Sequence, residues 1–128
     1  MIKIVSDSSA LYSKEEGQVK GISILPLIVT INGSTYNEYE DIKTKEFIDI
    51  INEGHIPVSS QPAIGEVLNV YNENEDCEII NISMADGLSG TYNSACVAKE
   101  MAENSKRIEV INSGTLCGPQ KYLGDLAV

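Results

Sequence analysis

Two short segments of this chain place serine and threonine hydroxyls, together with glycine or proline, directly ahead of a predicted helix. They are residues 57–62 (PVSSQP) and 86–92 (DGLSGTY). The first turn of a helix presents backbone N–H groups without partners and a partial positive charge, so an anionic group can bind there. Neither segment contains Lys, Arg, His or Cys. The chemistry that they predict is therefore the binding of an anion rather than an attack on it.

The segment around Ser89 has one interpretation that its residues disfavour and two that stay open. A serine nucleophile elbow has glycine two residues after the serine, where this chain has Thr91, and a triad needs a histidine, of which His55 is the only one. A hydrolase is therefore disfavoured. Serine and threonine are common helix caps, whereas flanking glycines such as Gly87 and Gly90 let a ligand approach the backbone. Capping and ligand binding both remain.

The hydroxyls of Ser59 and Ser60 carry the same two interpretations. Pro62 suits the first turn of a helix, so capping alone would explain this segment. Two such segments in one domain favour a shared binding role. Asp7, in a polar turn after the first predicted strand, fits a ligand group and a turn cap equally well.

Composition excludes several classes of function. The chain has 128 residues, which is the size of one domain, with 9 basic and 19 acidic residues and a net charge of −10. Such a field disfavours nucleic acid and acidic membrane surfaces as partners, so local dipoles must hold any bound anion. The acidic run of Glu38, Glu40 and Asp41 is interpreted as solvated rather than as a metal site.

Sequence motifs argue against cofactors and against export. The three cysteines are odd in number and form no CxxC pair, and there is neither a G-x-G-x-x-G nor a Walker pattern. We therefore predict no metal, no disulfide and no nucleotide cofactor. No long apolar segment or cleavage site follows the N-terminus, so we expect a cytoplasmic protein without stable membrane insertion.

Strands alternate with helices along the chain, which predicts an α/β fold with a mostly parallel sheet and helices on both faces. Polar turns follow three of the strands and are expected to meet at the carboxyl edge of that sheet. A capping box begins at Ser13, a kink at Pro26 divides one strand in two, and Asn32-Gly33 predicts a hairpin. The expected strands cover residues 2–5, 22–31 in two pieces, 34–36, 78–83 and 107–111. The expected helices cover residues 44–52, 63–72 and 89–103, and a last helix begins at about residue 116. The polar turns cover residues 6–9, 84–91 and 112–115.

Two expectations concern individual helices. Thr44 is expected to cap the helix over 44–52, with Phe47, Ile48, Ile50 and Ile51 facing the core. Residues 123–128 keep helical apolar spacing without a terminating signal, which suggests that the chain is part of a larger protein.

At these same residues the chain resembles the DegV family. The resemblance covers all 128 residues and depends on five motifs that occur in the family's order. They are 5–10 (VSDSSA), 24–27 (ILPL), 59–62 (SSQP), 87–95 (GLSGTYNSA) and 110–114 (VINSG).

The resemblance implies a fatty-acid-binding protein that is not itself an enzyme. Such a protein presents a long-chain fatty acid to the catalytic subunit of a fatty acid kinase, which phosphorylates the carboxylate to an acyl phosphate. Matching of the motifs assigns the carboxylate contacts to Ser59 and Ser89, with Ser60, Gly90 and Thr91 as secondary ligands. The alternatives are a domain that binds a small phosphorylated metabolite and a non-catalytic interaction module.

The chain departs from the family pattern at several places. The family usually has threonine where Ser59 stands, and aspartate where Leu11 stands. Asp86 brings a negative charge close to the expected anion site. Family members are about twice as long, and their second domain closes over the acyl chain. We therefore expect this chain to correspond to the N-terminal α/β domain (residues 1–128) without the lipid-enclosing domain.

Overall fold

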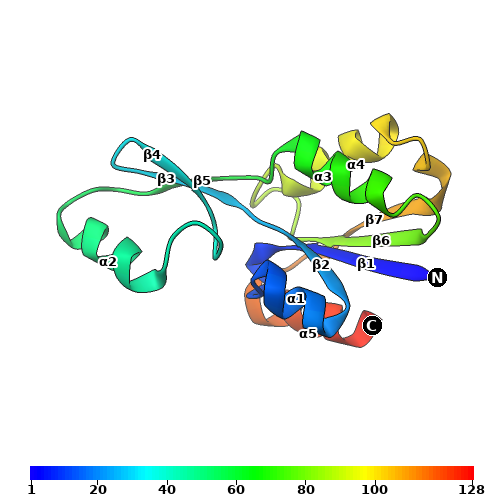
Figure 1. Ribbon diagram of the computed structural model, residues 1–128, viewed down its shortest axis with the longest axis horizontal. Helices are drawn as coiled ribbons and strands as arrows, with labels where there is room; N and C mark the ends of the chain where they lie inside the picture. Colours follow the sequence, from blue (N-terminus) through cyan, green and yellow to red (C-terminus); the bar gives the residue numbers. More distant parts are fainter.

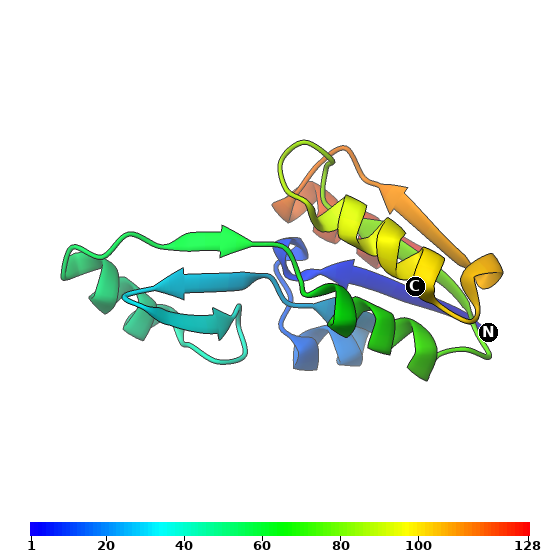
Figure 2. The same ribbon diagram turned by 90° about the horizontal axis from the view of Figure 1, so that it is seen from above.

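The computed structural model describes residues 1–128 and consists of a body and a smaller lobe that projects from one end of it (Figure 1 and Figure 2). The body is a parallel four-stranded sheet in the order β2-β1-β6-β7, and the lobe is built on an antiparallel sheet in the order β4-β3-β5. The body contains β1 (Ile2–Asp7), η1 (Ser8–Ala10), α1 (Lys14–Lys20), β2 (Ile22–Leu25), α3 (Ile64–Glu73), β6 (Glu78–Ser83), α4 (Thr91–Met101), η2 (Ser105–Arg107), β7 (Ile108–Asn112) and α5 (Cys117–Ala127).

Helices cover both faces of the parallel sheet, as predicted. Helices α3 and α4 lie on one face, and α1 and α5 lie on the other (Figure 1). Each side has its own apolar core, centred on Val5 and Tyr71 on the first side and on Ile4 and Ile22 on the second. Helix α1 lies so close to β2 that a Cβ added at Gly17 would be 2.7 Å from the carbonyl oxygen of Ile22. The predicted fold class is confirmed.

Several local signals form the structures that they predict. Ser13 and Glu16 make the capping box of α1. Both residues of the Asn32-Gly33 turn have positive φ, 49° and 76°, which is the backbone of a tight two-residue hairpin. Two starts differ from expectation. Lys43 rather than Thr44 occupies the cap position of α2 and makes no side-chain cap bond, and α4 begins at Thr91, two residues later than expected.

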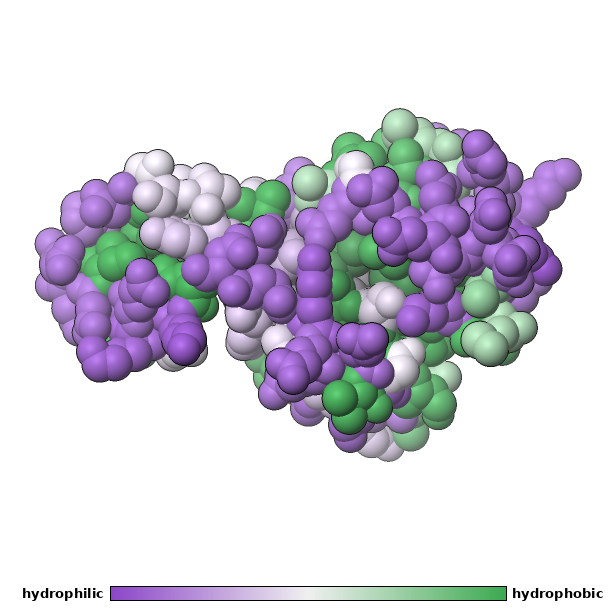
Figure 3. Space-filling model, in the orientation of Figure 1, coloured by the Kyte–Doolittle hydropathy of each residue, from purple (hydrophilic) through white to green (hydrophobic).

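The lobe consists of β3 (Ile28–Ile31), β4 (Ser34–Asn37), α2 (Thr44–Asn52) and β5 (Val58–Ser60). The expectation that α2 turns an apolar face into a core is wrong in one respect, because no residue of α2 is buried. Ile48 is 48% exposed and Ile51 is 37% exposed. A single helix on a three-stranded sheet has too little protein around it to enclose its apolar face. Figure 3 shows the resulting apolar area on the lobe.

No helix combines the length with the apolar composition that crossing a bilayer requires.

Tyr71 of α3 joins the helical layer to the sheet through a buried hydrogen bond. Its hydroxyl accepts a bond of 2.7 Å from Nδ2 of Asn81 in β6. Burial raises the pKa of Tyr71 from its ordinary value of 10 to about 12. The folded protein therefore holds the phenolic proton more tightly than the unfolded chain does, and this contribution to stability is lost as the pH rises from 10 to 12.

Tyr71→Phe is expected to lower the free energy of unfolding at pH 7 by about 1–3 kcal/mol, because it leaves the amide of Asn81 without an acceptor. Urea unfolding of both proteins should show this difference shrinking as the pH rises from 10 to 12. Tyr122→Phe, at a residue that is 63% exposed, is the control. A difference that stays constant across this pH range would contradict the assignment to the Tyr71 hydroxyl.

Candidate functional site

Three polar turns meet at the carboxyl edge of the parallel sheet, as predicted. The turn after β6 is joined to the turn after β7 by a backbone bond of 2.8 Å from Ala85 N to Thr115 O. A second bond of 3.0 Å joins Ser113 N to Ser83 O. These two backbone bonds hold the turns after β6 and β7 side by side. The end of β1 is joined to the turn after β6 through Asp7, as described next.

Asp7 is buried (1% exposed), and its carboxylate accepts hydrogen bonds from three parts of the chain. It accepts from the N–H and hydroxyl of Ser9, from Met84 N at 2.9 Å and from Nε2 of Gln120 at 3.0 Å. The first bond makes Asp7 the cap of η1. Of the two roles that the sequence left open, the structure supports the cap. Gln120 was missed, because a buried glutamine in a late helix carries no sequence signal.

The Ser89 segment forms a compact turn at the start of α4. The hydroxyls of Ser89 and Thr91 lie 2.9 Å apart, and Thr91 N donates to Oγ of Ser89 at 3.3 Å. Thr91 is buried, Ser89 is half-buried and Gly90 occupies the cap position. The Ser89 hydroxyl thus lies at the positive end of an 11-residue helix, and the Thr91 hydroxyl is its hydrogen-bond partner.

Ser59 and Ser60 lie on strand β5 rather than in a loop. Ser59 pairs with Val29 of β3, and both serines are exposed. The cap of α3 is Ala63, which makes no side-chain bond. The capping interpretation is therefore wrong for this segment, because its hydroxyls belong to the lobe's sheet. A ligand role stays open for both serines.

The two hydroxyl segments meet at Gln61 and Gly90. A Cβ added at Gly90 would lie 3.2 Å from both Cδ and Oε1 of Gln61, so the glutamine side chain lies directly against the glycine backbone. A side chain at position 90 would force Gln61 to move. This contact fixes the end of β5 beside the start of α4, and Gln61 is a second residue whose role sequence reasoning missed.

The Ser89 segment contains a single acidic side chain, that of Asp86. Asp86 is exposed, and its carboxylate accepts a bond from the N–H of Gly87 within the same turn. No group of histidine, cysteine, aspartate or glutamate side chains has an arrangement that could hold a metal ion. None of the hollows in the protein surface is lined by Ser59 or Ser89. The arrangement offers hydroxyls and a helix start at an open surface.

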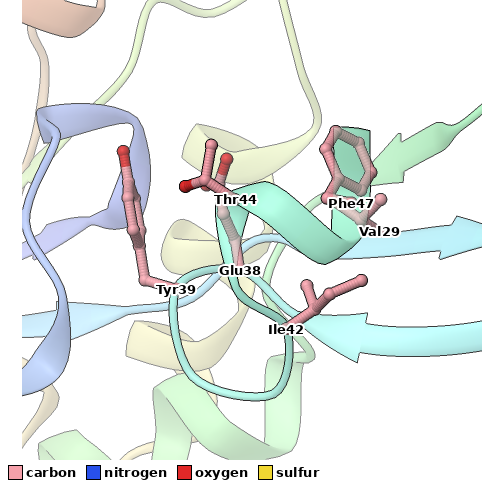
Figure 4. A pocket seen from close by; sticks show the side chains of 6 residues that line it. All are labelled: Val29, Glu38, Tyr39, Ile42, Thr44 and Phe47. Atoms are coloured by element: carbon pink, nitrogen blue, oxygen red, sulfur yellow. The ribbon is translucent and has the colours of Figure 1, made fainter. Parts of the chain in front are cut away.

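An apolar hollow of about 180 Å³ lies nearby in the lobe (Figure 4). Paired residues of neighbouring strands project to the same side of a sheet, so Val29 in this hollow and Ser59 share one face. Tyr39 stands at one side of the hollow, and burial, followed by the neighbouring Glu38, raises its pKa. The lining consists of Val29, Glu38, Tyr39, Ile42, Thr44 and Phe47.

The amino-acid sequence matches a known protein family. The profile of a family described as "Uncharacterised protein, DegV family" matches residues 1–127. A DegV domain-containing protein of Staphylococcus aureus (strain N315) is 40% identical over 115 residues, which are 88% of this chain and 40% of that protein.

Two solved structures share the fold. DegV from Bacillus subtilis, named a fatty acid binding protein, has 32% identity and a TM-score of 0.84 over 96% of this chain and 44% of that chain. A stearic acid-binding protein from Eubacterium ventriosum has 28% identity and a TM-score of 0.85 over 98% of this chain and 45% of that chain. The chain thus spans less than half the length of these relatives.

Asp7→Asn is expected to lower the free energy of unfolding by about 3 kcal/mol. The new amide group would place a donor against N–H groups that now donate to the carboxylate, and hydrogen bonds to charged groups contribute about 1.5–3 kcal/mol each. Urea unfolding gives the stability, and hydrogen exchange of the Met84 amide should accelerate. Asp49→Asn, on the exposed face of α2, is the control. Unchanged protection of Met84 would show that Asp7 does not hold this turn.

Proposed function

Since this chain belongs to the DegV family, we propose that it binds a fatty acid through the carboxylate and presents it to a fatty acid kinase. Ser59 and Ser89 are the proposed carboxylate ligands. Ser60, Gly90 and Thr91 are the proposed secondary ligands. The protein is the carrier, and the separate kinase is the enzyme.

The observation that supports this proposal best is the contact between Gln61 and Gly90. It joins the strand that carries Ser59 to the helix start that follows Ser89. In the proposed site, hydroxyl donors from these two parts of the chain bind one carboxylate. Hydrogen bonds from neutral donors to a charged carboxylate contribute about 1.5–3 kcal/mol each before desolvation.

The family supports the lipid part of the proposal. One relative above is named a fatty acid binding protein and another a stearic acid-binding protein. Burial of an acyl tail contributes about 0.8 kcal/mol per methylene, so the tail supplies most of the affinity and the hydroxyls fix the head group. The apolar hollow beside Val29 lies on the sheet face of Ser59 and offers apolar surface next to the head group.

The proposed reaction belongs to the kinase. The γ-phosphoryl group of ATP is transferred to a carboxylate oxygen, which gives an acyl phosphate and ADP. Neutral hydroxyl ligands leave the carboxylate anionic and therefore nucleophilic. No histidine or cysteine lies in either hydroxyl segment, which agrees with a binding role rather than with catalysis.

Nuclear magnetic resonance of the ¹⁵N-labelled chain titrated with octanoate tests the head-group site. We expect amide shifts in residues 59–61 and 87–92, because the carboxylate would accept bonds there. Ser89→Ala should weaken binding about tenfold, which corresponds to one hydrogen bond to a charged group. Ser34→Ala, at an exposed serine of the lobe, is the matched control.

Two further titrations separate the alternatives. Octan-1-ol, which has the tail without the charge, should not shift residues 87–92. Inorganic phosphate that shifts these residues more strongly than octanoate does would favour a phosphorylated metabolite instead. Octanoate shifts located away from both segments would refute the assignment of Ser59 and Ser89.

The kinase role is tested with palmitate, ATP and a fatty acid kinase catalytic subunit, trapping acyl phosphate with hydroxylamine. Hydroxamate should form faster when this chain is added, and the increase should be smaller for Ser89→Ala. The same amount of hydroxamate with and without the chain would contradict the proposal that it presents the fatty acid.

A further inference from the structure

A closed set of three hydrogen bonds lies where the chain passes from the body into the lobe. The buried hydroxyl of Ser8 donates to Oε2 of Glu38 at 2.6 Å and accepts from the N–H of Leu27 at 2.9 Å. The N–H of Glu38 then donates to the carbonyl oxygen of Leu27 at 2.8 Å. Leu27 is the residue through which the chain passes from β2 in the body towards β3 in the lobe.

We propose that Ser8 and Glu38 are positioning residues, which fix the orientation of the lobe and thereby the place of Ser59. Their effect on a bound carboxylate depends on the proposed function above, whereas their effect on the lobe's orientation does not. Glu38 belongs to the acidic run that the sequence led us to interpret as solvated. The structure differs, because this carboxylate is half-buried and bonded to the body.

Strand pairing links the position of Leu27 directly to the positions of Ser59 and Ser60. Strand β3 begins at Ile28, immediately after Leu27, and Ile28 pairs with Ser60 while Val29 pairs with Ser59. A rotation of the chain at Leu27 would therefore move both serines as a unit. No intervening loop could absorb the movement.

The other attachments of the lobe do not replace this one. Glu40 accepts a bond of 2.8 Å from Lys14 N, but this bond is exposed to water. Gln61 lies against Gly90 at the second connection and makes a packing contact. Both views show that most of the lobe extends away from the body (Figure 1 and Figure 2). The Ser8–Glu38 bond is the partly buried polar link, and low local dielectric strengthens such a bond.

Distances between a spin label in the lobe and one in the body, measured by double electron–electron resonance, test the proposal without any ligand. Spin labels are attached at Ser34→Cys in the lobe and Glu100→Cys in the body, with Cys77, Cys96 and Cys117 replaced by serine. Glu38→Ala is expected to shift or broaden the distance distribution. Glu38→Gln should keep the original distribution, because the amide oxygen still accepts from Ser8. Glu46→Ala removes the same charge from an exposed place on the lobe and should change nothing.

Ser8→Ala should reproduce the effect of Glu38→Ala, and the double variant should add little, since both remove the same bond. The distance measurement does not depend on the buried Ser8 alone, because Glu38 is half-buried in a turn and belongs to neither apolar core. A distribution unchanged in Glu38→Ala overturns the proposal.

Octanoate titration of the same variants separates this proposal from the proposed function. Ser8→Ala, at a residue that does not line the hollow, should weaken octanoate binding about tenfold in parallel with the distances, and Glu46→Ala should not. Absence of octanoate binding by the unchanged chain would refute the fatty acid site, while the distances would still decide the role of Glu38. Equal octanoate binding by Ser8→Ala despite an altered distance would overturn the link to Ser59.

Discussion

The arrangement of this edge of the molecule depends on two neighbouring residues at the end of β1. Asp7 holds the turn after β6 through Met84 N, and Ser8 holds the start of the lobe through Leu27 and Glu38. Both side chains are buried, and a buried polar group without partners is costly. Another placement of either hydroxyl segment would cost these side chains one or more of their present partners. The geometry of the candidate site is therefore a consequence of the sheet's core rather than of the site residues themselves.

Local chemistry made much of the fold predictable. The capping box at Ser13, the strand interruption at Pro26 and the Asn32-Gly33 hairpin each involve residues within four positions of one another, and each formed as expected. The meeting of the polar turns followed from a general property, since parallel strands bring their carboxyl ends to one edge. Here the sequence pattern determined both the element and its place in the fold.

Nonlocal partners explain what could not be predicted. Gln120 contacts Asp7 across 113 positions of sequence and Glu38 contacts Ser8 across 30, and nothing near either residue indicates its partner. Strand β5 has three residues, two of them serine, which is too short and too polar for a strand signal. The apolar spacing of α2 was recognised, but spacing does not reveal how much protein surrounds a helix. Its partial exposure follows from the small size of the lobe's sheet.

The proposed binding of an acidic ligand by this acidic chain requires that local dipoles outweigh the overall charge. Charges on exposed residues are screened within about 8 Å at physiological ionic strength, so few of the acidic residues act on a carboxylate beside Ser89. Asp86 lies three positions before Ser89 in the sequence, and its carboxylate accepts a hydrogen bond from the N–H of Gly87 in the same turn. The start of α4 offers positive potential over a single turn, enough for one carboxylate and too little for a polyanion. The net charge of −10 thus disfavours nucleic acid without preventing the binding of the monoanion proposed above.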